Sequence, residues 1–80
     1  MKKLIKFEKV GCNPCFVLQN YLDDKGVEVE KIMALDEPEL SAQYEIGSLP
    51  TLILLDEEGN EIQRSIGFKP NEVEEMISKL

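Results

Sequence analysis

Apolar and polar residues follow the pattern of an extended strand over residues 3–10 and the pattern of a helix over residues 13–25. In the first segment Ile5 and Phe7 fall on one face and Leu4 on the other, because successive side chains of a strand point to opposite faces. Apolar residues on both faces predict an inner strand that is covered on two sides. In the second segment the apolar residues recur at helical spacing.

The middle of the chain predicts a strand, a short helix and another strand. Residues 27–35 form the second predicted strand, and a helix is expected to follow it as far as Glu45. Asp36 and Glu39 have the spacing of a capping box at the start of this helix. Residues 51–55 are the most apolar segment of the chain and predict a second inner strand.

The last part of the chain predicts a hairpin partner and a terminal helix. Residues 61–66 alternate in polarity, and we expect Ile62 and Ile66 on a dry face with the polar residues on a wet one. Pro70 opens the last helix in its first turn, where its missing N–H costs nothing. That helix has one apolar face, formed by Val73, Met76, Ile77 and Leu80.

The predicted element order is β-α-β-α-β-β-α. A strand, a helix and a strand within about 35 residues predict a parallel pair with a right-handed crossover. Together with the antiparallel hairpin, this unit predicts an α/β fold. We expect a mixed four-stranded sheet in the order 2-1-3-4, flanked by three helices.

Composition and charge limit the classes of function. Eighty residues predict a single domain, 1–80, with one small core. The net charge of −7 argues against a nucleic-acid partner, since phosphate binding requires a basic patch. The longest apolar run, 52–55, is too short to span a membrane, and charged residues interrupt the N-terminal segment where a signal peptide would be apolar. We therefore expect a cytoplasmic protein without a membrane partner, and we expect it to be a monomer.

The only two cysteines stand in the sequence Cys12-Asn13-Pro14-Cys15, between the first predicted strand and the first helix. Unpaired N–H groups and the helix dipole stabilise a thiolate at a helix start, and the thiolate is the form that attacks disulfides. A second thiol one turn inward can then attack the mixed disulfide. This placement predicts an accessible Cys12 with a lowered pKa and a Cys15 that points inward.

Other roles for two cysteines fit this chain less well. A closed zinc site needs four ligands, and the chain has no histidine and no third cysteine, so zinc would require a second subunit or carboxylates. A structural disulfide between positions so close in sequence would remove little unfolded-state entropy. Redox chemistry is therefore the favoured interpretation, with no metal.

Three features together resemble the thioredoxin-like superfamily. The Cys-Asn-Pro-Cys motif is similar to the Cys-Gly-Pro-Cys of thioredoxins. The Leu-Pro-Thr sequence at 49–51 stands where that superfamily places a cis-proline facing the thiols. The Ile-Gly-Phe sequence at 66–68 precedes an amphipathic C-terminal helix, as it does in the superfamily. The resemblance spans essentially the whole chain and implies a minimal thioredoxin fold.

The resemblance also implies how the site residues act. Cys12 would be the nucleophile and Cys15 the resolving thiol of a thiol–disulfide oxidoreductase. Pro50 would shape a docking groove, with Gly67 as a further substrate-binding residue. The backbone of Leu49 would pair with an extended substrate, as in β-strand addition.

The partners implied are client proteins that contain disulfides and a flavin-dependent reductase of the thioredoxin-reductase type. The protein would carry no cofactor of its own. One alternative is a glutaredoxin-like enzyme that is reduced by glutathione. Another is a non-catalytic redox sensor or a thiolate metal carrier.

The chain departs from thioredoxins at Lys6, which stands six residues before Cys12, where thioredoxins place a buried aspartate. In one interpretation Lys6 holds its charge in water or pairs with an acid such as Glu8. In the other, its ammonium lies near the thiols, favours the thiolate and makes the protein more oxidising. Asn13 and Pro14, between the cysteines, are further candidates for tuning the thiols.

Overall fold

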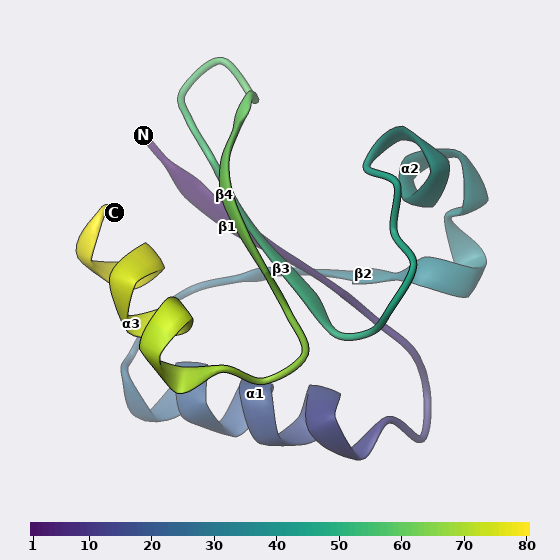
Figure 1. Cartoon of the computed structure of the whole chain (residues 1–80), viewed down its shortest axis with the longest axis horizontal. Helices are drawn as coiled ribbons and strands as arrows, with labels where there is room; N and C mark the ends of the chain where they lie inside the picture. The colour runs from purple at the N-terminus through teal and green to yellow at the C-terminus, as the bar shows by residue number, and fades with distance from the viewer.

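Strand β1 (Lys3–Glu8) lies inside a four-stranded sheet in the computed structural model, which describes residues 1–80 (Figure 1). The strands are ordered β2-β1-β3-β4, with β1 and β2 parallel and the other two pairs antiparallel. The remaining strands are β2 (Glu30–Met33), β3 (Thr51–Leu55) and β4 (Glu61–Ile66). The predicted α/β fold and the strand order 2-1-3-4 are confirmed.

Three α-helices flank the sheet, and Figure 1 shows α1 and α3 on one side of it and α2 on the other. They are α1 (Asn13–Asp24), α2 (Pro38–Gln43) and α3 (Pro70–Ser78). A short 3-10 helix, η1 (Ala34–Asp36), connects β2 to α2. No helix is long and apolar enough to cross a lipid bilayer.

The alternation of side chains along β1 and β3 divides the core into two layers. The layer under α1 and α3 contains Leu4, Leu18, Leu22, Leu52, Leu54, Val73 and Met76. The layer on the α2 side contains Ile5, Phe7, Ile32, Ala34, Ile53 and Leu55. Each fully buried aliphatic or aromatic side chain stabilises the fold by about 1.5–3 kcal/mol. As predicted, β1 and β3 are inner strands, and every residue of β3 is buried.

The segment after α1 differs from the prediction of a strand over residues 27–35. The strand is shorter, because the chain enters η1 directly after Met33. The predicted capping box is wrong, since Glu37 is the N-cap of α2 and makes no side-chain capping bond. A residue before proline is disfavoured in helical geometry, so Glu37, which precedes Pro38, cannot belong to the helix. Helix α2 also ends earlier than expected, at Gln43.

The predicted faces of β4 are also wrong. Ile62 and Ile66 are exposed, whereas Ser65 is buried. The register pairs Ser65 with Leu52, which belongs to the layer under α1 and α3. There the Ser65 hydroxyl donates to Glu72 of α3 at 2.7 Å, so a polar residue occupies a dry face with its hydrogen bond satisfied.

Two carboxylates in the β3–β4 hairpin are held in their ionised form. Backbone N–H groups of Asn60 and Glu58 donate to Asp56, at 2.8 and 2.9 Å, and lower its pKa below the ordinary value of 3.8. The Arg64 side chain donates to Glu61 and lowers the pKa of that carboxyl below 4.5. A group whose pKa is lower in the folded state adds stability above its unfolded pKa and loses it as the pH falls.

We therefore expect the unfolding temperature to decrease as the pH falls from about 5 to about 3. The Asp56→Asn variant should show a smaller decrease over the same range, because the amide that replaces the carboxyl group cannot be protonated there. Thermal unfolding followed by circular dichroism at a series of pH values measures both effects. Parallel curves for the variant and the wild type would contradict the assignment to Asp56.

Candidate functional site

The loop between β1 and α1 places both cysteines at the start of a helix. Strand β1 ends at Glu8, and Gly11, in the turn that follows, adopts a left-handed conformation with φ of 74°, which a residue with a side chain rarely adopts. Cys12 follows as the N-cap with an extended backbone. Helix α1 then begins at Asn13, with Pro14 in its first turn as predicted.

Cys12 and Cys15 form a disulfide, with their Cα atoms 5.2 Å apart. The Cys12 sulfur also accepts a hydrogen bond from the backbone N–H of Cys15 at 3.2 Å. It thus acts as the capping acceptor of α1, a position more often held by a Ser or Asp oxygen. After reduction, the same N–H and the helix dipole would stabilise a negative charge on this sulfur.

The two cysteines differ less in exposure than the sequence suggested. Cys12 is 7% exposed and Cys15 is 4% exposed, so both are buried in the disulfide form. The predicted accessibility of Cys12 concerns its free thiol and stays a prediction, because in this structure the sulfur is bonded to Cys15 and turned toward the helix backbone. The asymmetry between them lies instead in the capping hydrogen bond, which Cys12 alone accepts.

A cavity of about 320 Å³ opens onto both cysteines. Its wall combines apolar side chains with a few polar and charged ones. The residues beside the cysteines are Glu8, Lys9, Val10, Gly11, Phe16, Gln19, Lys31 and Met33. The disulfide therefore lies in a partly apolar recess that contains one carboxylate.

Lys6 lies beneath α1 with its side chain 0% exposed. Its Nζ atom is 2.7 Å from a carboxylate oxygen of Glu8 and donates to the side-chain oxygen of Gln19 at 2.5 Å. The pairing with Glu8 matches one of the two interpretations of the sequence, although the ammonium does not reach water. Lys6 does not line the cavity of the disulfide, so its effect on the thiols remains a prediction.

The residues predicted to bind substrate lie at the same end of the sheet as the cysteine loop. Phe7, near the end of β1, pairs with Thr51 of β3, and Thr51 pairs with Ile66 of β4. The Leu49–Pro50 peptide bond, directly before Thr51, is cis. The N–H of Gly67 donates to the Pro50 carbonyl at 2.8 Å, so these two residues are in direct contact. Neither they nor Leu49 line the cavity itself.

Comparison with known proteins agrees with this geometry. A thioredoxin-like protein of Bacillus subtilis, YosR, which is derived from the SPbeta prophage, is 41% identical over 78 residues and covers 98% of each chain. The thioredoxin of Chlamydia trachomatis is 34% identical over 82 residues, covering 95% of this chain and 79% of that protein. The chain belongs to the thioredoxin-like superfamily. No protein-family model matches it.

Solved thioredoxins share the fold of this thioredoxin-like chain. The thioredoxin Deadhead of Drosophila melanogaster superposes with a TM-score of 0.86 over 99% of this chain and 80% of that one, at 21% identity. Plasmodium falciparum thioredoxin gives a TM-score of 0.79 at 27% identity, over 98% of this chain and 70% of that one. The minimal thioredoxin fold expected from the sequence is confirmed.

Two polar residues of the thioredoxin-like site were not identified as site residues from the sequence. They are Glu8, which the sequence suggests only as a partner for Lys6, and Gln19. The spacing of both residues in the sequence is enough to identify them. Glu8 follows Lys6 by two residues and so shares its strand face. Gln19 follows Cys15 by four residues and so lies on the same side of α1.

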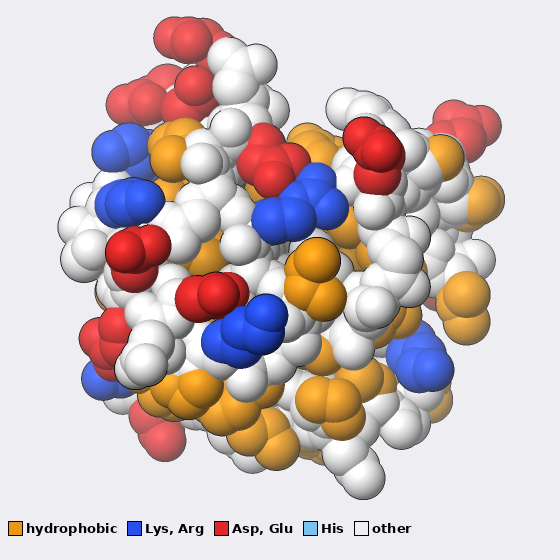
Figure 2. All heavy atoms as spheres, in the orientation of Figure 1, with side chains coloured by type: hydrophobic (Ala, Val, Ile, Leu, Met, Phe, Trp, Pro, Cys, Tyr) orange, Lys and Arg blue, Asp and Glu red, His pale blue; other side chains and the backbone are white.

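Apolar side chains remain exposed near the disulfide of this thioredoxin-like protein. They are Val10 in the loop and Phe16 and Val17 in the first turns of α1. In Figure 2, orange hydrophobic side chains gather at the bottom of the view, where Figure 1 places α1. Exposed apolar side chains that cluster on a monomer surface are typical of interaction sites.

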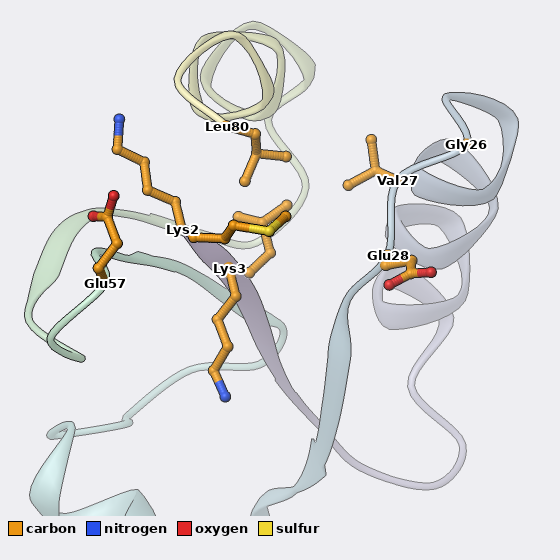
Figure 3. A pocket seen from close by; sticks show the side chains of 9 residues that line it. Lys2, Lys3, Gly26, Val27, Glu28, Glu57 and Leu80 are labelled. Carbon is orange, nitrogen blue, oxygen red and sulfur yellow. The ribbon is translucent and has the colours of Figure 1, made fainter.

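A larger cavity of about 540 Å³ lies at the opposite ends of β1 and α1 (Figure 3). It is lined by Lys2, Lys3 and Leu80, among others, and contains no cysteine. The ammonium groups of both lysines are already occupied. Lys2 donates to the Lys79 carbonyl and Lys3 pairs with Glu30, each at 2.9 Å. The cavity is separate from the disulfide site.

Proposed function

We propose that this protein is a thiol–disulfide oxidoreductase that cycles between the Cys12–Cys15 disulfide and the dithiol and reduces disulfides in client proteins. One observation carries the proposal. The Cys12 sulfur caps the N-terminus of α1 and accepts the Cys15 N–H, while it is already bonded to the Cys15 sulfur. A sulfur in this position is stabilised as a thiolate, and its exchange partner is one helical turn away.

In the proposed cycle the Cys12 thiolate attacks one sulfur of the client disulfide and releases the other as a thiolate, which takes a proton from water. This step produces a mixed disulfide between Cys12 and the client. The Cys15 thiol then loses its proton and attacks the Cys12 sulfur. The Cys12–Cys15 disulfide forms, and the client leaves with its second sulfur reduced. Two electrons pass from the dithiol to the client, and a reductase must return them.

Leu49, Pro50 and Gly67 are proposed to bind the client beside the cysteines. The contact between Gly67 and the Pro50 carbonyl supports this role because it joins the two loops at the cysteine end of the sheet. The exposed side chains of Val10 and Phe16 suit an extended client segment with apolar residues. We further propose that residues 1–80 act as one monomeric domain in the reducing cytoplasm.

The proposed electron donor is a flavoenzyme of the thioredoxin-reductase type, and glutathione is the alternative. Insulin reduction, followed by the turbidity of the precipitating chains, tests both. One reaction contains NADPH and thioredoxin reductase, and the other contains glutathione, NADPH and glutathione reductase. We expect the protein to accelerate the first reaction and the Cys12→Ser variant to be inactive in it.

The outcomes separate the candidate functions. Activity only with glutathione would replace the proposed donor. If the protein does not accelerate insulin reduction even when dithiothreitol supplies the electrons, the catalytic proposal is wrong, and the non-catalytic alternatives, a redox sensor or a thiolate metal carrier, take its place.

A further inference from the structure

We propose that Glu8 accepts the proton of Cys15 in the step that resolves the mixed disulfide, and that Lys6 and Gln19 are positioning residues for Glu8. This inference rests on the proposed function. It assigns a role to the one carboxylate in the cavity of the disulfide and explains why a lysine is buried beneath α1.

The resolving step needs a proton acceptor close to Cys15. Only a thiolate attacks a disulfide, so the Cys15 thiol must lose its proton before or during the attack on Cys12. Cys15 is 4% exposed in the disulfide form and lies in the first turn of α1, and this burial limits direct transfer to bulk water. The proton must therefore pass to a group in the cavity, either directly or through one water molecule.

Glu8 is the only side chain in the cavity wall that can serve as this base. The other charged residues of the wall are Lys9 and Lys31, and an ammonium group has no lone pair with which to accept a proton. Gln19 has a neutral amide. Glu8 is 19% exposed, so a proton that it receives can continue to solvent.

The contacts of Glu8 hold its carboxylate at the cavity wall. One oxygen, Oε1, pairs with the buried Lys6 ammonium at 2.7 Å, and no protein group donates to the other oxygen. Gln19 accepts from Lys6 through its oxygen, and its amide nitrogen donates to Asp23 at 2.9 Å, which fixes the orientation of the amide. A carboxylate held on one side and free on the other is arranged for proton transfer.

In the resolving step one proton leaves Cys15, and one disulfide bond replaces another. The Cys15 S–H bond breaks and its proton moves to the free oxygen of Glu8. The Cys15 sulfur forms a bond to the Cys12 sulfur, and the bond between Cys12 and the client sulfur breaks with its electron pair on the client. The client thiolate then takes up a proton from Glu8 or from water, and Glu8 returns to the carboxylate.

Stopped-flow reaction of the reduced protein with 5,5′-dithiobis(2-nitrobenzoate) separates the two steps. The first equivalent of coloured thionitrobenzoate reports the attack by Cys12, and the second reports resolution by Cys15. In Glu8→Gln we expect the first phase to change by less than about 2-fold and the second to slow by about 100-fold at about pH 6. The ratio of the wild-type to the Glu8→Gln rate of the second phase should fall toward 1 near pH 9, where a thiol ionises without a base.

Two further variants make the result specific. Glu28→Gln removes an acid from the distant cavity and should leave both phases unchanged. Lys6→Met combined with Glu8→Gln removes the buried ammonium that the single variant would leave without a carboxylate. This double variant should resolve as slowly as Glu8→Gln, which keeps the test informative if the single variant does not fold.

The pH profile distinguishes a proton acceptor from a structural residue. The other titratable groups around Glu8 are Cys12, Cys15, Lys6, Lys9 and Lys31, and all are retained in the single variant. A ratio of wild-type to Glu8→Gln resolution rates that stays constant from about pH 6 to about pH 9 would overturn the proposal. Equal second phases would also overturn it. A wild-type protein that releases only one equivalent and cannot reduce insulin would instead contradict the proposed function.

Discussion

Cys12→Ser is expected to lower the rate of insulin reduction by at least about 1000-fold, because a hydroxyl cannot replace the attacking thiolate. Cys15→Ser should also lose turnover, but for a different reason. Its Cys12 can still attack a client, and the mixed disulfide then accumulates because no resolving thiol is present. Non-reducing gels of each variant incubated with an oxidised client measure the difference.

The two variants serve as controls for each other, since each keeps one cysteine in the same fold. The donor of the capping hydrogen bond to the Cys12 sulfur is the backbone N–H of residue 15, so Cys15→Ser retains it. We also expect iodoacetamide to modify Cys12 faster than Cys15 in the reduced wild type. Equal rates of alkylation at neutral pH, or mixed disulfides on Cys15 in Cys12→Ser, would contradict the assigned roles.

Much of the fold could be predicted from the sequence because its elements have strong local signals. The two-sided apolar pattern of β1 and β3 requires inner strands, and the β-α-β unit restricts the topology to few arrangements. The errors lie where tertiary contacts override a local pattern. Ser65 is buried because its position opposite Leu52 faces α3, where Glu72 satisfies its hydroxyl. The alternation of β4 alone favours the opposite face.

Part of the site could also be predicted, because it too has strong local signals in the sequence. The helix-start position of Cys12 follows from local sequence, because a proline in the first turn and a glycine before the motif define where α1 begins. The cavity wall does not follow from local sequence. It joins Glu8 from β1, Gln19 from α1 and Lys31 from β2, and only the packing of α1 over the sheet brings these residues together.

Within the Lys6–Glu8 pair, removing Glu8 is expected to lower the free energy of unfolding more than removing Lys6. In Glu8→Gln the fully buried Lys6 ammonium loses its only carboxylate, and we expect a loss of about 3 kcal/mol in the free energy of unfolding. In Lys6→Met the remaining Glu8 carboxylate is 19% exposed and can turn toward water. Methionine also fills the space of the lysine stem, so we expect a loss of only about 1 kcal/mol.

Urea unfolding of the oxidised proteins, followed by circular dichroism, measures these differences. The Lys6→Met and Glu8→Gln double variant completes the cycle and should be more stable than Glu8→Gln alone, because the uncompensated ammonium is gone. A loss of about 3 kcal/mol is large for a domain whose total stability is expected to lie between about 4 and 12 kcal/mol. Equal losses in the two single variants, or a double variant less stable than Glu8→Gln, would mean that burial of the ammonium does not determine the energy of this pair.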